Sequence, residues 1–212
     1  MKETAEQWSV RTWKARHDVG YFPTSEQHAG WRVYEAMPDW FMRWARPEPQ
    51  DSALEIGCGY GEWMIPLAPY ARRLAGIDIH PEPIAKAREL FAERGIENCE
   101  VRVSDGLSIP FSGPFSLVYS ISVFQHLPRS IVRGYIEETT RVLGAGGRAL
   151  HHFRNADTVG PYPPLAEDIA ANHTGDFSCG WTADQVRCAG NDAGLNVEVH
   201  DIGLFLVMVA RR

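Results

Sequence analysis

A short apolar segment that runs directly into three alternating glycines is the feature that most restricts the fold of this chain. Residues 52–56 are predicted to form a strand, and Gly57, Gly59 and Gly61 follow it. Glycines at these positions permit a tight turn and let a ligand approach the backbone, because they carry no Cβ. The dinucleotide fingerprint G-x-G-x-x-G needs a further glycine where this chain has Glu62, so the turn matches that fingerprint only in part.

The chain from residue 51 onward alternates between strand and helix patterns. Short apolar runs bounded by glycine, proline or aspartate predict strands, and apolar residues at helical spacing predict helices. This alternation is typical of an α/β fold in which helices cover both faces of a mostly parallel sheet. Ligands of such sheets bind outside the carboxyl ends of the strands, where the strand order reverses. We predict seven strands at 52–56, 74–79, 99–103, 115–120, 148–153, 195–199 and 204–209, and helices at 81–94, 130–143 and 182–193.

Two regions stand outside this alternation. Residues 1–50 hold five of the seven tryptophans at helical spacing, so we predict an N-terminal helical cap in which Pro38 breaks or kinks the second helix. The core is then residues 51–212, with an insertion at about 154–180 that is rich in proline and aromatic residues. Aromatic side chains in either region can clasp an apolar or planar small molecule, or the tryptophans simply fasten helices to the sheet.

Acidic residues lie at or near the carboxyl ends of the first three predicted strands. Glu55 precedes the glycine turn, where a carboxylate suits a ligand with positive charge and hydroxyl groups better than a pyrophosphate. Asp78 can accept both hydroxyls of a ribose, or it caps the helix that begins near Pro81. Asp105 can accept from the exocyclic amine of adenine while the N–H of Gly106 donates to a ring nitrogen, or the pair is a simple turn.

Histidines follow the fourth and fifth predicted strands. His126 lies in the loop after residues 115–120, and it is either a general base or a residue that stiffens the loop. His151 and His152 end the fifth strand, and strand alternation points them to opposite faces of the sheet. We take His126 and His152 as candidate catalytic residues. The spacing of histidines and cysteines matches no familiar zinc pattern, so no metal site is expected.

Taken together and in this order, the strand ends resemble those of class I S-adenosylmethionine-dependent methyltransferases. The segments that carry the resemblance are residues 54–61, 76–79, 104–106, 115–120 and 141–148. One departure is Gly144-Ala145, where many relatives have Lys-Pro, in a turn away from the cofactor.

The resemblance implies a Rossmann-like sheet, S-adenosyl-L-methionine as the cofactor, and methyl transfer as the reaction. It also assigns roles to the residues at matching positions. These are Glu55, Gly57, Cys58, Gly59 and Gly61 for the methionine part, Asp78 for the ribose, Ile79, Asp105 and Gly106 for the adenine, and Ser120 for the ammonium group.

The remaining expectations concern the acceptor and the setting. A net charge of −6 argues against a nucleic-acid groove and against docking on acidic lipid. No signal peptide and no apolar run long enough to cross a membrane is visible, so we expect a cytoplasmic protein. We expect a small-molecule acceptor that is methylated on oxygen or nitrogen. The alternatives are a protein or RNA methyltransferase, a nicotinamide-dependent oxidoreductase, and a non-catalytic module that binds S-adenosylmethionine.

Overall fold

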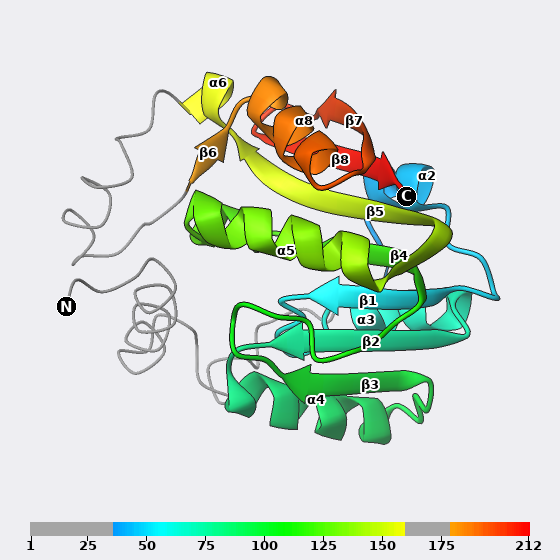
Figure 1. Ribbon diagram of the computed structural model, residues 1–212. Helices are drawn as coiled ribbons and strands as arrows, with labels where there is room; N and C mark the ends of the chain where they lie inside the picture. Colours follow the sequence, from blue (N-terminus) through cyan, green and yellow to red (C-terminus); the bar gives the residue numbers. More distant parts are fainter. Residues whose placement is uncertain (1–35, 160–178) are drawn as a thin grey trace.

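The structure is a computed structural model that describes residues 36–159 and 179–212. Its centre is one mixed sheet in the order β3-β2-β1-β4-β5-β8-β7, and a short β6 pairs with β5 (Figure 1). All seven predicted strands are present, and the two-residue β6 adds an eighth. The strands are β1 Ser52–Ile56, β2 Arg73–Asp78, β3 Cys99–Val103, β4 Phe115–Ser120, β5 Leu143–Asn155, β6 Gly180–Trp181, β7 Asn196–Asp201 and β8 Phe205–Arg211.

Strands β1 to β6 run parallel, and the last two strands pair antiparallel. The sheet is therefore the mostly parallel α/β sheet that the sequence predicts. β1 lies between β2 and β4, so the chain reverses its direction of travel across the sheet at β1. A sheet of this kind binds ligands outside the carboxyl ends of its strands where the strand order reverses, which here is at β1 and β4. We call this region the crevice.

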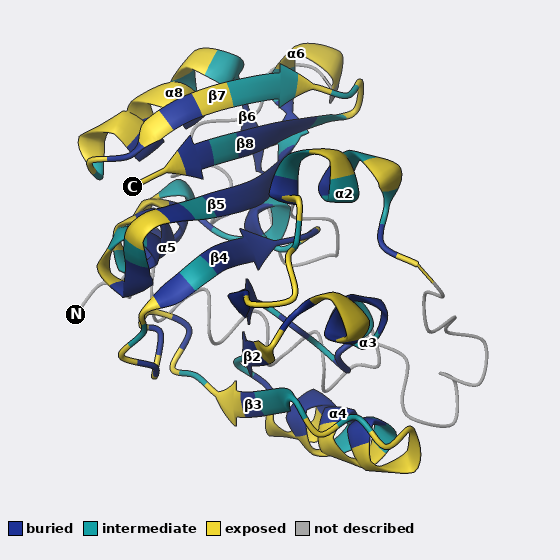
Figure 2. Ribbon diagram, turned by 90° about the vertical axis from the view of Figure 1, so that its right-hand side faces the viewer, coloured by how far each residue is buried: buried dark blue, intermediate teal, exposed yellow. Residues whose placement is uncertain are grey.

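Helices cover both faces of the sheet (Figure 2), and each face has its own apolar core. Apolar side chains from α5 and α8, such as Val132, Ile136 and Val186, form the core on one face. Side chains from α2, α3 and α4 form the core on the other face. The helices are α2 Asp39–Ala45, α3 Met64–Leu67, α4 Pro81–Glu93, α5 Arg129–Val142, α6 Ala156–Val159 and α8 Ala183–Asp192, with 3₁₀ turns η2 Ala68–Tyr70 and η3 Phe124–His126.

Local sequence signals explain where the long helices begin and end. Pro81 opens α4, where its missing N–H is no loss, and Gly95 follows the helix with φ +65°. Thr182 opens α8 with a capping box in which Thr182 and Gln185 satisfy each other's backbone N–H groups. In α5 the side chains that recur at helical spacing, Ile131, Tyr135, Ile136, Thr139 and Val142, are all buried. Within the described residues, no helix is long and apolar enough to cross a membrane.

Pro38 lies immediately before α2, where its ring fits a helix start. The predicted helix that Pro38 would break lies within residues 1–35, outside the described residues. The structure corrects one detail of the predicted strands. The fifth strand begins at Leu143 rather than at Arg148, because the glycine-rich segment between them continues the strand across a register shift against β4. Residues 1–35 and 160–178, which hold most of the predicted cap and insertion, lie outside the described residues.

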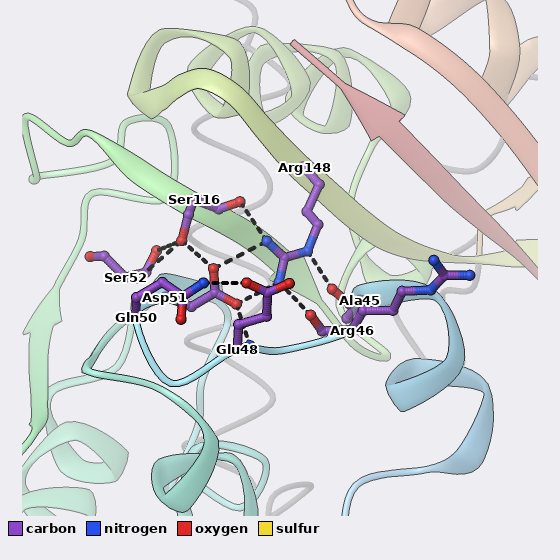
Figure 3. A network of polar contacts seen from close by, with 8 residues as sticks. All are labelled: Ala45, Arg46, Glu48, Gln50, Asp51, Ser52, Ser116 and Arg148. Carbon is purple, nitrogen blue, oxygen red and sulfur yellow. Dashed lines mark hydrogen bonds and ion pairs between the residues drawn. The ribbon is translucent and has the colours of Figure 1, made fainter.

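A polar network fixes the end of α2 to the sheet at the edge opposite the carboxyl ends of β1 and β4 (Figure 3). The Arg148 guanidinium forms an ion pair of 2.5 Å with Asp51 and donates to the carbonyls of Ala45 and Arg46. Ser116 completes the network by donating to Asp51 at 2.6 Å. The last carbonyls of a helix need partners from outside the helix, and here one arginine supplies them.

Candidate active site

The glycine turn after β1 is tied to the end of β2. The backbone N–H groups of Gly57 and Cys58 both donate to the carbonyl of Ile77, at 2.8 and 2.9 Å. The N–H of Gly59 donates to the Asp78 carboxylate at 3.1 Å. These bonds bring the predicted methionine and ribose positions together on one side of the crevice.

The structure changes the reason why glycine is needed at two positions of this turn. A Cβ on Gly57 would lie 2.4 Å from the Val123 side chain, and one on Gly61 would lie 2.6 Å from Phe91. Both glycines also have φ above +70°. Packing of the protein against the turn, together with left-handed backbone geometry, therefore requires these glycines. The Cys58 side chain is buried over Gly76 of β2, so this residue can meet a ligand only through its backbone.

Glu55 is a buried carboxylate within β1. Its side chain accepts a hydrogen bond of 3.0 Å from the Tyr119 hydroxyl, which comes from the neighbouring strand β4. Burial raises the pKa of Glu55 well above its usual value, and the negative charges of Glu62 and Asp78 raise it further.

Glu62 is an additional acidic residue at this turn. In the sequence this residue departs from the dinucleotide fingerprint, and no binding role is predicted for it. Its carboxylate accepts the N–H of Tyr60 at 3.1 Å, and a Cβ on Gly59 would lie 3.1 Å from the same oxygen. Burial raises the pKa of Glu62 to about 7. An acidic residue directly after the third glycine is the signal that could have identified it.

Asp78 ends β2 and connects two loops at the crevice. One carboxylate oxygen accepts from Gly59, and the other accepts from the N–H of His80 at 2.9 Å. His80, rather than Asp78, occupies the cap position of α4, and the His80 side chain makes no cap hydrogen bond. Ile79 follows at a half-buried position, where the adenine contact is predicted.

Asp105 and Gly106 lie in the loop after β3. One oxygen of Asp105 accepts from the N–H groups of Leu107 and Ser108, at 2.9 and 2.8 Å. Burial alone would raise the pKa of Asp105, but these hydrogen bonds outweigh burial and hold it below its usual value. The predicted turn is thus present. The second oxygen of the Asp105 carboxylate accepts from the Ser108 hydroxyl, and because Asp105 is exposed, this oxygen can also accept from a ligand.

Ser120 ends β4 and belongs to a fully buried polar chain. Its hydroxyl lies 3.0 Å from Nδ1 of His151, and Nε2 of His151 lies 3.2 Å from the Thr139 hydroxyl on α5. Burial lowers the pKa of His151 to about 3, so the ring is neutral at physiological pH. This chain fixes the end of β4 against α5.

His152 faces the opposite side of the sheet from His151, as strand alternation predicts. Its ring stacks on Trp40 of α2 at 5.4 Å and contacts Phe205 of β8 at 4.2 Å. The N–H of Ser122 donates to Nδ1 of His152 at 3.3 Å, and burial lowers the pKa of this histidine to about 4. A neutral ring that accepts at Nδ1 carries its proton on Nε2, so His152 offers a hydrogen-bond donor rather than a base.

His126, the other candidate catalytic residue, ends the 3₁₀ turn η3 in the loop after β4. Its Nε2 lies 3.0 Å from the side-chain nitrogen of Gln125. The ring is half-buried, and its backbone N–H donates to Val123, the residue that packs on Gly57. His126 therefore belongs to the loop that touches the glycine turn.

The charges of the crevice suit the predicted cofactor. The side chains of Glu55 and Glu62 form no ion pair with a lysine, arginine or histidine among residues 36–159 and 179–212. Their mutual repulsion, together with Asp78, is relieved by a cationic ligand and worsened by a pyrophosphate. S-adenosylmethionine carries a sulfonium, an ammonium group and ribose hydroxyls, so these residues fit it.

Comparisons with known proteins found both sequence relatives and similar folds. Residues 53–147 match the family model of a methyltransferase domain. The chain is 32% identical over 97 residues to the sterol 4-C-methyltransferase strm-1 of Caenorhabditis elegans, covering 45% of this chain and 28% of that protein. It is 24% identical over 168 residues to a 2-heptyl-1-hydroxyquinolin-4(1H)-one methyltransferase of Mycobacteroides abscessus, covering 75% of this chain and 71% of that protein.

The fold is similar to that of a SAM-dependent methyltransferase from Aquifex aeolicus, with a TM-score of 0.60 and 20% identity over 78% of this chain and 84% of that one. At this identity the likeness shows the fold alone. The chain spans at most half the length of several curated relatives that it matches.

Proposed function

Given that this chain carries a class I S-adenosylmethionine-dependent methyltransferase domain, we propose that the protein transfers a methyl group to an oxygen or nitrogen of a small molecule. The observation that carries this proposal is the group of carboxylates around the glycine turn. The negative charges of Glu55, Glu62 and Asp78 repel one another, and a cationic nucleoside bound between them would reduce this repulsion.

We assign the binding roles as follows. The turn after β1 and Glu55 hold the methionine part, and Asp78 accepts the ribose hydroxyls. The loop after β3 reads the adenine through Asp105 and Gly106, Ile79 packs on its ring, and the backbone near Ser120 receives the ammonium group. When bound, S-adenosylmethionine supplies an electrophilic methyl group on its sulfonium. Holding an acceptor in line with that group contributes several kcal/mol to lowering the barrier, about 7 or more in favourable cases.

The small-molecule acceptor is supported by the aromatic residues at the carboxyl edge of the sheet. Trp40, His152 and Phe205 form a stack there, and flat aromatic side chains bind flat or apolar ligands well. One relative is named for a 2-heptyl-1-hydroxyquinolin-4(1H)-one substrate. In this proposal His126 removes the proton of a hydroxyl acceptor, and the Nε2–H of His152 orients the acceptor.

Isothermal titration with S-adenosylmethionine tests the proposal. The protein is expected to bind the cofactor, and Asp78→Ala is expected to weaken binding severely, whereas Asp192→Ala on the exposed surface of α8 leaves it unchanged. Absence of binding at millimolar cofactor refutes the proposal.

Activity needs a second measurement. Incubation with a mixed pool of metabolites and labelled cofactor is expected to yield a methylated small molecule. Cofactor binding without any labelled product indicates a non-catalytic module, and label in protein or RNA indicates the corresponding methyltransferase. Thermal stabilisation by NAD or NADP instead of S-adenosylmethionine indicates an oxidoreductase.

A further inference from the structure

We propose that Glu62 makes the cofactor site selective for charge, so that it favours S-adenosylmethionine over the demethylated product S-adenosylhomocysteine. The inference rests on the proposed function, because it concerns the same crevice. The two molecules differ at one atom: the sulfur of the first is a sulfonium cation, and the sulfur of the second is a neutral thioether. A carboxylate next to that sulfur stabilises only the first.

The position of Glu62 is set by the turn itself. Its carboxylate accepts from the N–H of Tyr60 at 3.1 Å, two residues earlier in the chain. The same oxygen lies against the open side of Gly59, where a Cβ would be 3.1 Å away. The carboxylate is therefore held on the glycine turn where the methionine part of the cofactor is assigned, rather than in a salt bridge on the surface.

Glu62 is held by backbone N–H groups of its own turn, whereas Glu55 is held by a side-chain hydroxyl from another strand. Glu55 is anchored by the Tyr119 hydroxyl, and both oxygens of Asp78 accept backbone N–H groups. Glu62 has the hydrogen bonds of the turn but no ion pair in the described part of the chain. Its charge state can thus respond to a ligand with little rearrangement.

Among residues 36–159 and 179–212, the titratable groups that interact with Glu62 are all acidic or neutral. Asp78 faces it from β2, Glu55 from β1, and Cys58 and Tyr60 from the turn. The pKa of Glu62, raised to about 7 by burial, means that near neutral pH about half of the free protein carries a proton on this carboxylate. A cation that binds next to it favours the ionised form, so binding releases that proton.

The experiment compares the two ligands by isothermal titration at pH 7 in buffers of different ionisation enthalpy. Wild-type protein, Glu62→Gln and a control variant, Glu137→Gln, are titrated with S-adenosylmethionine and with S-adenosylhomocysteine. Glu137 is exposed on α5, so this control removes the same charge away from the crevice. Glutamine keeps the size of Glu62 and its acceptor for the Tyr60 N–H.

We expect Glu62→Gln to weaken S-adenosylmethionine about tenfold while the affinity for S-adenosylhomocysteine stays within about twofold. We also expect wild-type protein to release up to about half a proton more on binding S-adenosylmethionine than Glu62→Gln does. Retained binding of S-adenosylhomocysteine shows that the variant is folded.

Two results for Glu62→Gln overturn the inference while leaving the proposed function intact. One is an equal loss of affinity for both ligands, and the other is unchanged affinity for both. In either case the ratio of the two affinities is the same as in wild type, so Glu62 does not set the preference. If wild-type protein binds neither ligand, the proposed function itself fails.

Discussion

Replacing Arg148 by methionine tests how α2 is held on the sheet. Methionine keeps much of the apolar stem of arginine but removes every hydrogen bond of the guanidinium. The variant leaves the Asp51 carboxylate, 4% exposed, without its cation, and it removes the donor for the carbonyls of Ala45 and Arg46. Removing one partner of a buried ion pair costs about 3–5 kcal/mol, because the remaining charge stays buried.

This cost predicts a clear shift in thermal unfolding. For a protein of this size, each kcal/mol corresponds to about 2–4 °C in Tm, so Arg148→Met should unfold about 6–20 °C below wild type. The matched control is Arg187→Met on α8, whose partner Asp184 is 89% exposed. An exposed pair of this kind contributes at most about 1 kcal/mol. If Arg148→Met unfolds within 2–3 °C of that control, about 1 kcal/mol, the reasoning is wrong.

The network also predicts a pH dependence. Burial alone would raise the pKa of Asp51, but hydrogen bonds from Arg148, Ser116 and Glu48 outweigh burial and lower it. A carboxyl group whose pKa is lower in the folded protein stabilises the fold above its unfolded pKa of about 3.9, and this contribution is lost as the pH falls through the folded value. Asp51→Asn should therefore be less stable than wild type at pH 7, and the difference should shrink below about pH 4. A difference that stays constant down to pH 2.5 contradicts this.

Two further predictions concern the crevice. Gly57→Ala should weaken cofactor binding, and it should destabilise the fold by more than the strain of about 1–2 kcal/mol at positive φ, because its methyl group would lie 2.4 Å from Val123. The control Gly95→Ala, at φ +65° with nothing within 4 Å, measures the backbone strain alone. Equal unfolding midpoints for the two variants would refute the clash with Val123. His126→Ala should lower turnover more than cofactor affinity, and unchanged turnover would show that His126 is not the base. His152→Gln should leave the shape of the pH–rate profile between pH 6 and 8 unchanged, because the pKa of His152 is already about 4. Loss of one limb of that profile in His152→Gln would show that His152 titrates during catalysis.

Features that depend on neighbouring residues could be predicted from the sequence. The start of α4 at Pro81, the inward face of α5 and the opposite orientations of His151 and His152 all follow from local periodicity and capping. The order of the strand ends likewise predicted that Asp78 would lie beside the glycine turn, because parallel strands end at one edge of the sheet. Asp78 and the glycine turn are joined there by a direct hydrogen bond.

Features that depend on distant residues could not be predicted in this way. Arg148 and Asp51 are 97 residues apart, and neither has a sequence pattern that marks it as half of an ion pair. β6 is only two residues long and exists because Gly180 and Trp181 pair with the end of β5. The requirement for Gly57 is also long-range, since Val123, from the loop after β4, fills the space beside it. Local patterns carry no information about which partner arrives from elsewhere in the chain.

The short helix α2 connects two edges of the molecule. Its last carbonyls are held by Arg148, and one turn earlier Trp40 lies on His152. Arg148 and His152 both belong to β5, so the contact at the start of this strand fixes the position of the Trp40 indole near its end. An N-terminal segment taken from a relative would therefore have to end in a helix whose last carbonyls Arg148 can reach. Without that contact, an aromatic residue of the new segment would have no fixed position beside His152.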